Sequence, residues 1–255
     1  MQGGSDMSGS ANDQVTYPPL DVLKLVADGV WIVDSGPLRV LGTPIPIRMT
    51  VVRLRNGDLW LHSPTRNTEA LTRELEQQGS VRHLVAPDVA HWSFVKDWQR
   101  HYPDAVTWAA PGLRDRSQVR KAGLRIDHDL GEMAPADWAD EIEQVLVPGL
   151  GFSEVDFLHI ATRTLMLTDL VQNFEPQKLP MVMRLMTRLI GVLGPEGGTP
   201  LYLRVAVRAK RKQAAHAASR MVDWNPERVI FSHGRWFDRN GAAALRRALG
   251  WLLPG

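Results

Sequence analysis

The sequence predicts a mixed α/β fold, and three features of its patterning lead to that class. From residue 50 onward, short apolar runs typical of buried strands alternate with longer segments of helical periodicity. Asn56-Gly57 separates two runs of alternating polarity and is the preferred type I′ turn of a β-hairpin. The chain has 255 residues, 44% of them hydrophobic, which is sufficient for a substantial core.

The elements of the N-terminal half follow from periodicity and turn residues. Residues 20–26 form a short amphipathic segment, and a strand over 29–36 ends at Gly36. Three prolines in residues 37–49 predict a loop or an irregular edge strand there. The other elements expected in this half are, in chain order, strands over 50–55 and 58–63, a helix over 67–78, a strand over 81–86, a helix from 91 onward, a strand over 105–109 and a small basic helix over 113–122.

The C-terminal half is predicted to return to strands and to end in helices. Its expected elements are, in chain order, strands over 142–147, 155–160 and 164–168, an apolar helix over 180–193, a basic amphipathic helix over 205–224, a strand over 229–232 and a helix over 240–252.

Composition and charge exclude several classes of protein. The chain contains no cysteine, so a metal site has to use His, Asp or Glu. No run of 18 apolar residues predicts a transmembrane helix, and the polar, Gly/Ser-rich residues 1–16 do not resemble a secretory signal. We therefore expect a disordered tail over 1–16 and a cytoplasmic protein. Net charge is only +2, and the basic segment 204–220 lacks interleaved aromatic residues, so nucleic-acid binding is not expected.

The Met/Leu-rich helix over residues 180–193 has several interpretations. Methionine is a common gap filler, so core packing is the simplest of them. Arg184 and Arg188 flank an apolar stripe, which also fits a lid over a site, a homodimer face or a contact with a membrane surface. The sequence leaves these alternatives open.

Three predicted strands are each followed by a side chain that can bind a metal. His91 follows the strand over 81–86, Asp169 ends the strand over 164–168, and His233 follows the strand over 229–232. Ligands of α/β proteins usually bind at the carboxyl ends of the strands. Two imidazoles and one carboxylate leave open positions on a divalent metal, which can activate water as a nucleophile. The alternative is that each histidine is a hydrogen-bonded structural residue.

Other polar residues are weaker candidates for a role at this site. Asp88, three residues before His91, is the expected general base or an additional carboxylate ligand. Arg163, Asn173 and Trp92 are the expected substrate-binding residues. For Arg163 the alternative is a plain hairpin turn, and for Asn173 it is a turn role in the loop that carries the aspartate.

The order of these motifs resembles that of the metallo-β-lactamase-like superfamily. In that family LIDTG, THxHxDH, a Gly-His pair, GD and GHG occur in this order. The corresponding stretches here are WLHSPT at 60–65, APDVAHW at 86–92, VPGLGF at 147–152, LTDL at 167–170 and FSHGRW at 231–236. Because the resemblance covers nearly the whole chain, it implies one domain over 17–255, built as a four-layer αββα sandwich. More narrowly, TLMLTDL and RVIFSHG are similar to a branch of domains of unknown function within that superfamily.

The chain also departs from the family pattern. Pro87 and Val89 stand where the two leading histidines of THxHxDH are expected, and Trp92 replaces the final histidine. Leu150 stands where the resemblance places the middle histidine ligand. None of these side chains binds a metal, so the first metal position is expected to be empty.

The resemblance implies that a second metal position remains. His91, Asp169 and His233 suffice for one divalent metal, zinc first, with iron or manganese as alternatives, or none if the site is a relic. The implied function is hydrolysis of a small-molecule ester, thioester, lactone or phosphoester, with Asp88 orienting or deprotonating water. The alternative is a non-catalytic relative that binds a small ligand, or a protein or membrane partner through the helix over 180–193.

Overall fold

The computed structural model describes residues 15–40 and 42–253. Residues 1–14 of the expected tail lie outside the described residues. Val15 and Thr16, at its end, are buried, and Lys178 donates a hydrogen bond of 2.8 Å from Nζ to the Thr16 carbonyl oxygen. These two residues therefore belong to the folded part of the chain.

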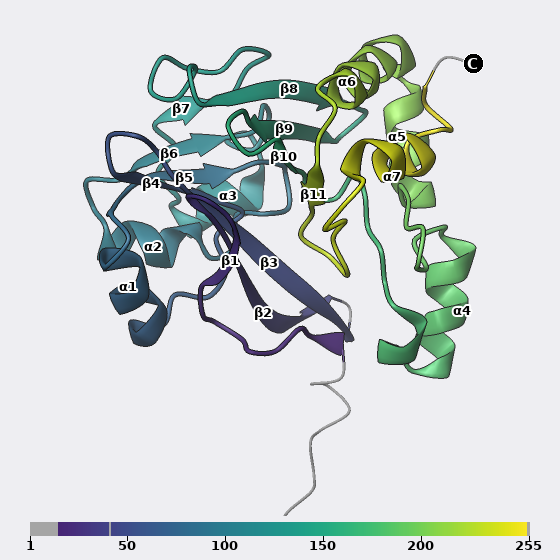
Figure 1. Cartoon of the computed structure of the whole chain (residues 1–255), viewed down its shortest axis with the longest axis horizontal. Coiled ribbons are helices and arrows are strands. Elements are labelled where there is room, and N and C mark those ends of the chain that lie inside the picture. The colour runs from purple at the N-terminus through teal and green to yellow at the C-terminus, as the bar shows by residue number, and fades with distance from the viewer. Residues whose placement is uncertain (1–14, 41, 254–255) are drawn as a thin grey trace, which may run out of the picture.

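The larger sheet contains seven strands in sequential order (Figure 1). They are β1 (Lys24–Ala27), β2 (Val30–Val40), β3 (Thr43–Arg53), β4 (Asp58–His62), β5 (Ser80–Ala86), β6 (Val106–Ala109) and β7 (His128–Asp129). Strands β1 to β4 pair antiparallel, and β4 to β7 pair parallel. Parallel neighbours require crossovers, which contain α1 (Glu69–Glu76), α2 (Val95–His101) and α3 (Ser117–Ala122).

The smaller sheet contains four strands in the order β11-β10-β9-β8. They are β8 (Ile142–Pro148), β9 (Ser153–His159), β10 (Thr164–Met166) and β11 (Arg228–Ile230). Its outer face packs against α5 (Leu201–Arg208), α6 (Arg211–Asp223) and α7 (Gly241–Ala248).

Apolar cores between successive layers hold the layers together. Between the sheets, Trp60 of β4 packs edge-on against Phe157 of β9, with ring centroids 4.9 Å apart. A second core joins the larger sheet to α1–α3, and a third joins the smaller sheet to α5–α7. Helices therefore cover the outer faces of two facing sheets (Figure 1). This arrangement confirms the predicted αββα sandwich.

The hairpin between β3 and β4 forms as predicted, but with a different turn. The Gly57 N–H donates to the Leu54 carbonyl oxygen at 2.9 Å, and the Leu54 N–H donates to that of Asp58 at 2.9 Å. Gly57 has a φ of +87°, whereas Asn56 is not in the positive-φ region. A type I′ turn requires positive φ at both central residues, so this is a three-residue loop with glycine in the left-handed position.

In the proline-rich segment, residues 37–40 continue β2 and residues 43–49 belong to β3, instead of forming the loop or irregular edge strand that was expected. Two of its three prolines are tolerated for a simple reason. Strand β4 pairs only with Thr50 to Arg53 of β3, so Pro44 and Pro46 lie where β3 has no neighbour on that side.

The single helix predicted over 205–224 is two helices, because the chain turns between Arg208 and Arg211. One helical turn after the buried Val207, the next inward position falls on Lys210 and Arg211, which are exposed. The prediction of one helix was therefore wrong at its centre.

Helix α4 (Met181–Leu189) lies outside the four layers (Figure 1). Of its nine residues only Thr187 is buried, so core packing does not explain its apolar sequence. Within the described part of the chain, no helix combines the length and apolar character needed to cross a bilayer.

Candidate metal centre

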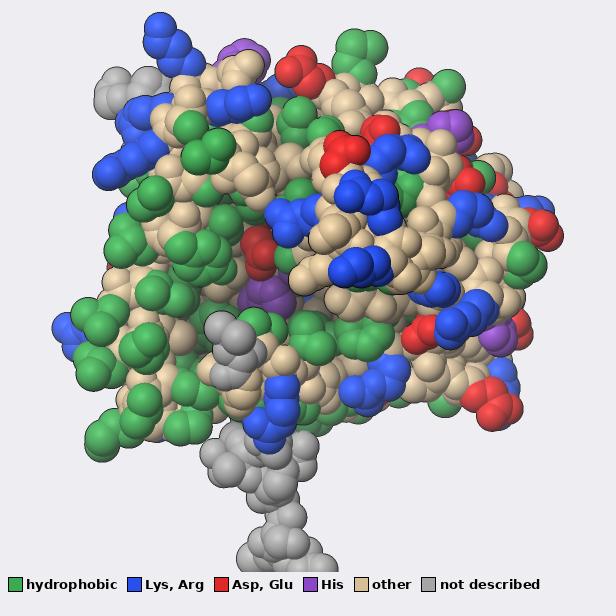
Figure 2. Space-filling view, turned by 180° about the vertical axis from the view of Figure 1, so that it is seen from behind, with side chains coloured by type: hydrophobic (Ala, Val, Ile, Leu, Met, Phe, Trp, Pro, Cys, Tyr) green, Lys and Arg blue, Asp and Glu red, His purple; other side chains and the backbone are tan. Residues whose placement is uncertain are grey.

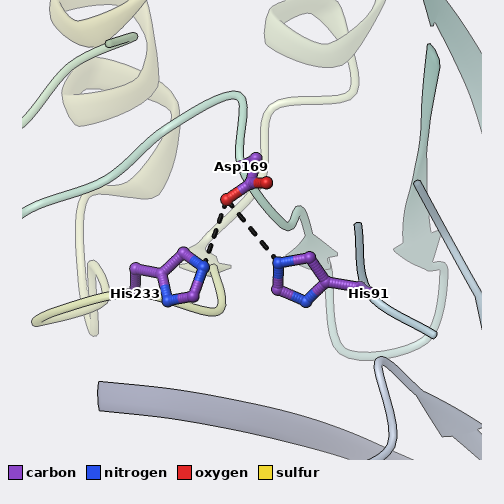
Figure 3. A group of neighbouring side chains, drawn as sticks. All are labelled: His91, Asp169 and His233. Atoms are coloured by element: carbon purple, nitrogen blue, oxygen red, sulfur yellow. Dashed lines mark ion pairs between the residues drawn. The ribbon is translucent and has the colours of Figure 1, made fainter. Parts of the chain in front are cut away.

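The three predicted metal-binding side chains converge at one point (Figure 3). His233 Nε2 lies 3.1 Å from Asp169 Oδ1, and His91 Nε2 lies 3.6 Å from the same oxygen. One donor atom from each of the three residues can be chosen so that all lie within 4.8 Å of one another. Two donors bonded to one ion at about 2 Å are about 3.3 Å apart in a tetrahedral arrangement. The two separations measured from Asp169 Oδ1, 3.1 and 3.6 Å, are therefore close to those expected around a shared metal ion.

His91 is placed by the turn that ends β5. Asp88 is fully buried, and its Oδ1 accepts hydrogen bonds of 2.7 Å from the backbone N–H groups of Ala90 and His91. This carboxylate-bonded turn occupies the positions where the sequence predicted the start of a helix, and α2 begins only at Val95. The turn directs the imidazole of His91 toward Asp169.

Both histidines are oriented through the ring nitrogen that faces away from Asp169. His91 Nδ1 lies 2.7 Å from the Ser63 hydroxyl. His233 Nδ1 donates to the Pro46 carbonyl oxygen at 2.8 Å, so its Nε2 is the nitrogen available to a metal. A partner on the far nitrogen that fixes ring and tautomer is typical of metal-binding histidines.

Asp169 is positioned by Glu154, a buried residue of β9. Glu154 Oε1 accepts from the Thr168 N–H at 2.7 Å, and its Oε2 accepts from the N–H groups of Asp169 and Leu170 at 2.9 Å. Gln172 also donates from Nε2 to Asp169 Oδ1 at 3.1 Å. The carboxylate of Glu154 thus holds the loop that carries the central donor, a role that sequence patterning did not reveal.

The loop that carries His233 is attached to β3 by Arg48, another residue without a sequence signal. Arg48 is buried and donates from Nη1 to the carbonyl oxygens of Phe231 and Gly234 at 2.8 and 2.9 Å. Its Nη2 lies 2.6 Å from Asp34 Oδ1, which neutralises the buried guanidinium.

Asn173 lies beneath the same loop and does not line the cavity. Its Nδ2 donates to the Arg235 carbonyl oxygen at 2.8 Å. Gly234 has a φ of +89°, and a Cβ there would lie 2.1 Å from the Asn173 carbonyl oxygen. Only glycine fits this approach, so the GHG-like motif reflects close backbone packing beside the site. The structure places Asn173 as a loop-positioning residue.

Arg163, predicted to bind substrate, lies at the opposite end of β10 from Asp169. It occupies the turn before the strand with a φ of +48°. Its guanidinium pairs with Glu227 at 3.7 Å and is half exposed. The structure therefore does not bring Arg163 to the site.

The charges of the cluster are mutually dependent. Burial opposes ionisation of Asp169, but the neighbouring His91 and His233 hold its pKa well below the ordinary value. Burial lowers the pKa of His91, yet the carboxylates of Asp88 and Asp169 outweigh this and raise it to about 9. Burial also raises the pKa of Asp88 to about 6. The shifts of His91 and Asp169 thus have one cause, the attraction between the imidazoles and the carboxylates that the cluster brings together.

One buried oxygen in the cluster is left without a partner. Asp88 Oδ2 has no hydrogen-bond partner among the described residues and lies 4.0 Å from His91 Nε2. A buried carboxylate oxygen is costly without a donor or a cation. The unpartnered oxygen beside His91, Asp169 and His233 thus fits a site where a divalent metal would be held by these three residues and would supply the missing positive charge.

The cluster lies at the floor of an open cavity of about 930 Å³. Figure 2 shows a hollow with a histidine and an acidic side chain at its floor and hydrophobic side chains beside it. Asp88, His91, Asp169 and His233 line the cavity, as does Trp92, which the sequence placed among the substrate-binding residues. Most of the other lining side chains are apolar and include Ile45, Ile47, Val89, Phe94, Phe152, Phe174, Met183, Met186 and Leu203.

A family model described as "Domain of unknown function (DUF4336)" matches residues 27–226 of this chain. The chain belongs to the DUF4336 family. The matched range includes His91 and Asp169, and His233 lies just beyond it. No curated protein sequence matches this DUF4336 chain.

Solved structures of metallo-β-lactamases share the fold of the DUF4336 chain. An enzyme from Erythrobacter litoralis with β-mercaptoethanol in its active site aligns with a TM-score of 0.61 and 14% identity, over 93% of this chain and 100% of its own. One from Pontibacter korlensis aligns with a TM-score of 0.60 and 15% identity, over 90% of this chain and 97% of its own. FIM-1 from Pseudomonas aeruginosa, solved in a mono-zinc form, aligns with a TM-score of 0.54 and 15% identity, over 91% of this chain and 96% of its own. The DUF4336 chain therefore has the metallo-β-lactamase fold that its motif order implied.

Proposed function

We propose that this DUF4336 protein is a hydrolase that holds one divalent metal through His91, Asp169 and His233. The observation that carries the proposal is the convergence of these side chains from three separate loops, with both imidazoles oriented by hydrogen bonds. Zinc is the metal we propose, and iron or manganese are alternatives that the same ligands accept. When bound, such a metal supplies Lewis-acid activation of water and of a carbonyl or phosphoryl oxygen.

We assign Asp88 the role of general base. Its Oδ1 is fixed by two backbone N–H groups, so its Oδ2 has one defined position beside the cluster. Asp88 is one of the residues that line the cavity, and this oxygen accepts no hydrogen bond from the described residues, which leaves it able to accept a proton from the attacking water. The hydrogen bond between the Ser63 hydroxyl and His91 Nδ1 keeps the His91 imidazole in one orientation while the proton moves.

The cavity favours a small-molecule substrate with an apolar body. Arg116 contributes the only Lys or Arg side chain among the described lining residues. A phosphoester would bring one or two negative charges to a cavity with little positive charge to receive them. We therefore favour an uncharged ester, thioester or lactone over a phosphoester.

Hydrolysis by metal-loaded protein tests this proposal. The purified chain, stripped of metal and reloaded with zinc, manganese or iron, is assayed on 4-nitrophenyl esters of increasing acyl length, thioesters, lactones and bis-4-nitrophenyl phosphate. We expect metal-dependent cleavage of an ester, thioester or lactone. Asp88→Asn should lower kcat by about 100-fold or more at full metal occupancy.

Arg163→Ala is the matched control, because Arg163 pairs with Glu227 away from the cavity. The hydrolytic activity of this variant should equal that of the unaltered chain. A chain that binds one metal but cleaves none of these substrates would contradict the enzyme proposal. That result would favour a non-catalytic relative that uses the same cavity to bind a ligand.

A further inference from the structure

Helices α4 and α5 expose a group of large apolar side chains next to the cavity. Each of these side chains is more than half exposed. They are Met181, Val182, Leu185, Met186 and Leu189 of α4 and Leu201, Tyr202 and Val205 of α5, and together we call them the apolar surface. A soluble monomer rarely exposes a contiguous patch of this kind, so a partner is expected to cover it.

The apolar surface is continuous across the two helices. In α4 its members follow the spacing i, i+1, i+4, i+5 and i+8, which places them on one face of the helix. The Leu201 N–H donates to the Ile190 carbonyl oxygen at 3.0 Å, which joins the start of α5 to the end of α4. Figure 2 shows hydrophobic side chains gathered on this side of the molecule, beside the hollow.

The surroundings of the apolar surface are strongly basic. Between residues 178 and 220 the only acidic residue is Glu196. The exposed cations on α4, α5 and the first turn of α6 are Arg184, Arg188, Arg208, Lys210, Arg211 and Lys212. An apolar helix face flanked by cations is the pattern of helices that lie in the interface of an anionic membrane.

We propose that the apolar surface docks on an anionic phospholipid bilayer, with α4 lying in the plane of the interface. A bilayer supplies both an acyl region for Met181 and Leu185 and phosphate groups for Arg184 and Arg188. A second copy of this chain is a poorer occupant. A symmetric interface would bring the same cations together, with only Glu196 in this segment to pair with them.

Docking would also bring the cavity to the membrane. Val182, Met183 and Met186 belong to α4 and line the cavity as well, so one helix contacts both the bilayer and the site. If the proposed hydrolase function holds, an amphiphilic substrate can pass from the bilayer into the cavity. The docking itself does not depend on that function.

Co-sedimentation of the full chain with lipid vesicles tests the docking. Vesicles of phosphatidylcholine alone are compared with vesicles of phosphatidylcholine and phosphatidylglycerol, at low and high salt. We expect binding to the anionic vesicles that weakens with added salt, and at least tenfold weaker binding to the neutral ones. Arg184→Gln combined with Arg188→Gln should weaken binding about 25-fold, at about 1 kcal/mol per cation.

Apolar variants separate docking from a general loss of structure. Met181→Ser combined with Leu185→Ser should weaken binding at least tenfold. Met133→Ser is the control, because Met133 is 81% exposed outside the apolar surface, and it should bind like the unaltered chain. All variants replace exposed side chains, and their melting temperatures are measured to confirm folding.

Several results would overturn the proposal. One is the absence of binding to anionic vesicles. Another is equal binding by Met133→Ser and by the variant that combines Met181→Ser with Leu185→Ser. The third is a dimer in light scattering for the unaltered chain that is absent for the variant that combines Met181→Ser with Leu185→Ser. Asp169→Asn, which removes a proposed metal ligand, should bind vesicles normally. A failure of docking is therefore distinguishable from a failure of the metal site.

Discussion

Replacing Glu154 by glutamine tests whether one buried carboxylate holds the loop of Asp169. The substitution converts one carboxylate oxygen into an NH₂ group at the same volume. If the NH₂ group replaces Oε1, the Thr168 N–H loses its acceptor. If it replaces Oε2, the N–H groups of Asp169 and Leu170 lose theirs. A buried donor left without an acceptor costs about 1–3 kcal/mol. Burial and the neighbouring Asp156 raise the pKa of Glu154 well above its ordinary value, so losing the charge recovers part of this cost.

We expect Glu154→Gln to lower the free energy of unfolding by about 2 kcal/mol. For a chain of this size that corresponds to a fall in melting temperature of about 4–8 °C. Because the loop carries the central donor, metal affinity should fall about tenfold or more. Differential scanning calorimetry of the metal-free chain and calorimetric zinc titration measure the two effects.

Asp156→Asn provides the matched control for Glu154→Gln. Asp156 is a buried carboxyl on the same strand, and neither of its oxygens accepts a backbone hydrogen bond in the described structure. Burial raises its pKa to about 7, so removing the charge should leave the melting temperature unchanged or raise it. Equal losses in Glu154→Gln and Asp156→Asn would refute the reasoning, because the backbone hydrogen bonds would then have no specific effect.

Three further predictions concern the residues around the metal centre. Ser63→Ala removes the hydroxyl 2.7 Å from His91 Nδ1, so zinc affinity should fall about tenfold in a calorimetric titration, and an unchanged affinity would contradict the orienting role. Arg48→Met breaks a buried ion pair and two backbone hydrogen bonds, and should lower the free energy of unfolding in urea by about 3–5 kcal/mol; a loss below about 1 kcal/mol would rule out its bracing role. The third prediction concerns the metal-free chain. Burial lowers the pKa of His91, but the carboxylates of Asp88 and Asp169 outweigh this and raise it from 6.5 to about 9. The stability that protonation of His91 contributes is therefore fully present below pH 6.5 and is lost as the pH rises to about 9. Thermal melts across this range should show the decline in the unaltered chain and a flatter profile in His91→Gln, and identical profiles would contradict the coupling.

The fold and the clustering of His91, Asp169 and His233 were predictable because they depend on short-range pattern. Asp169 and His233 follow β10 and β11, which are parallel neighbours in the smaller sheet and bring their carboxyl ends to one edge, and His91 follows β5 of the facing sheet. Polar residues just after such ends therefore come together whatever the intervening sequence. Motif order then identified the sandwich in spite of the substituted metal ligands.

The residues that support the donors were not predictable, because their roles depend on contacts between distant segments. The strand containing Glu154 reads SEVDFLH, an alternation typical of a strand with one solvent-facing side. In the structure all seven of its residues are buried, because one side faces the larger sheet and the other faces the helices. Arg48 acts on a loop more than 180 positions away in sequence. Arg163 was a candidate because of its charge alone, and its position at the start of β10 directs it away from the cavity.

Metal content tests the central claim most directly. The chain is purified without chelator, and zinc, iron and manganese are measured per chain by plasma mass spectrometry. The geometry of His91, Asp169 and His233 predicts about one equivalent of one of these metals, lost in His233→Ala and retained in Arg163→Ala. A chain that carries none of them, with a melting temperature unchanged by EDTA or by added metal, would contradict the metal centre.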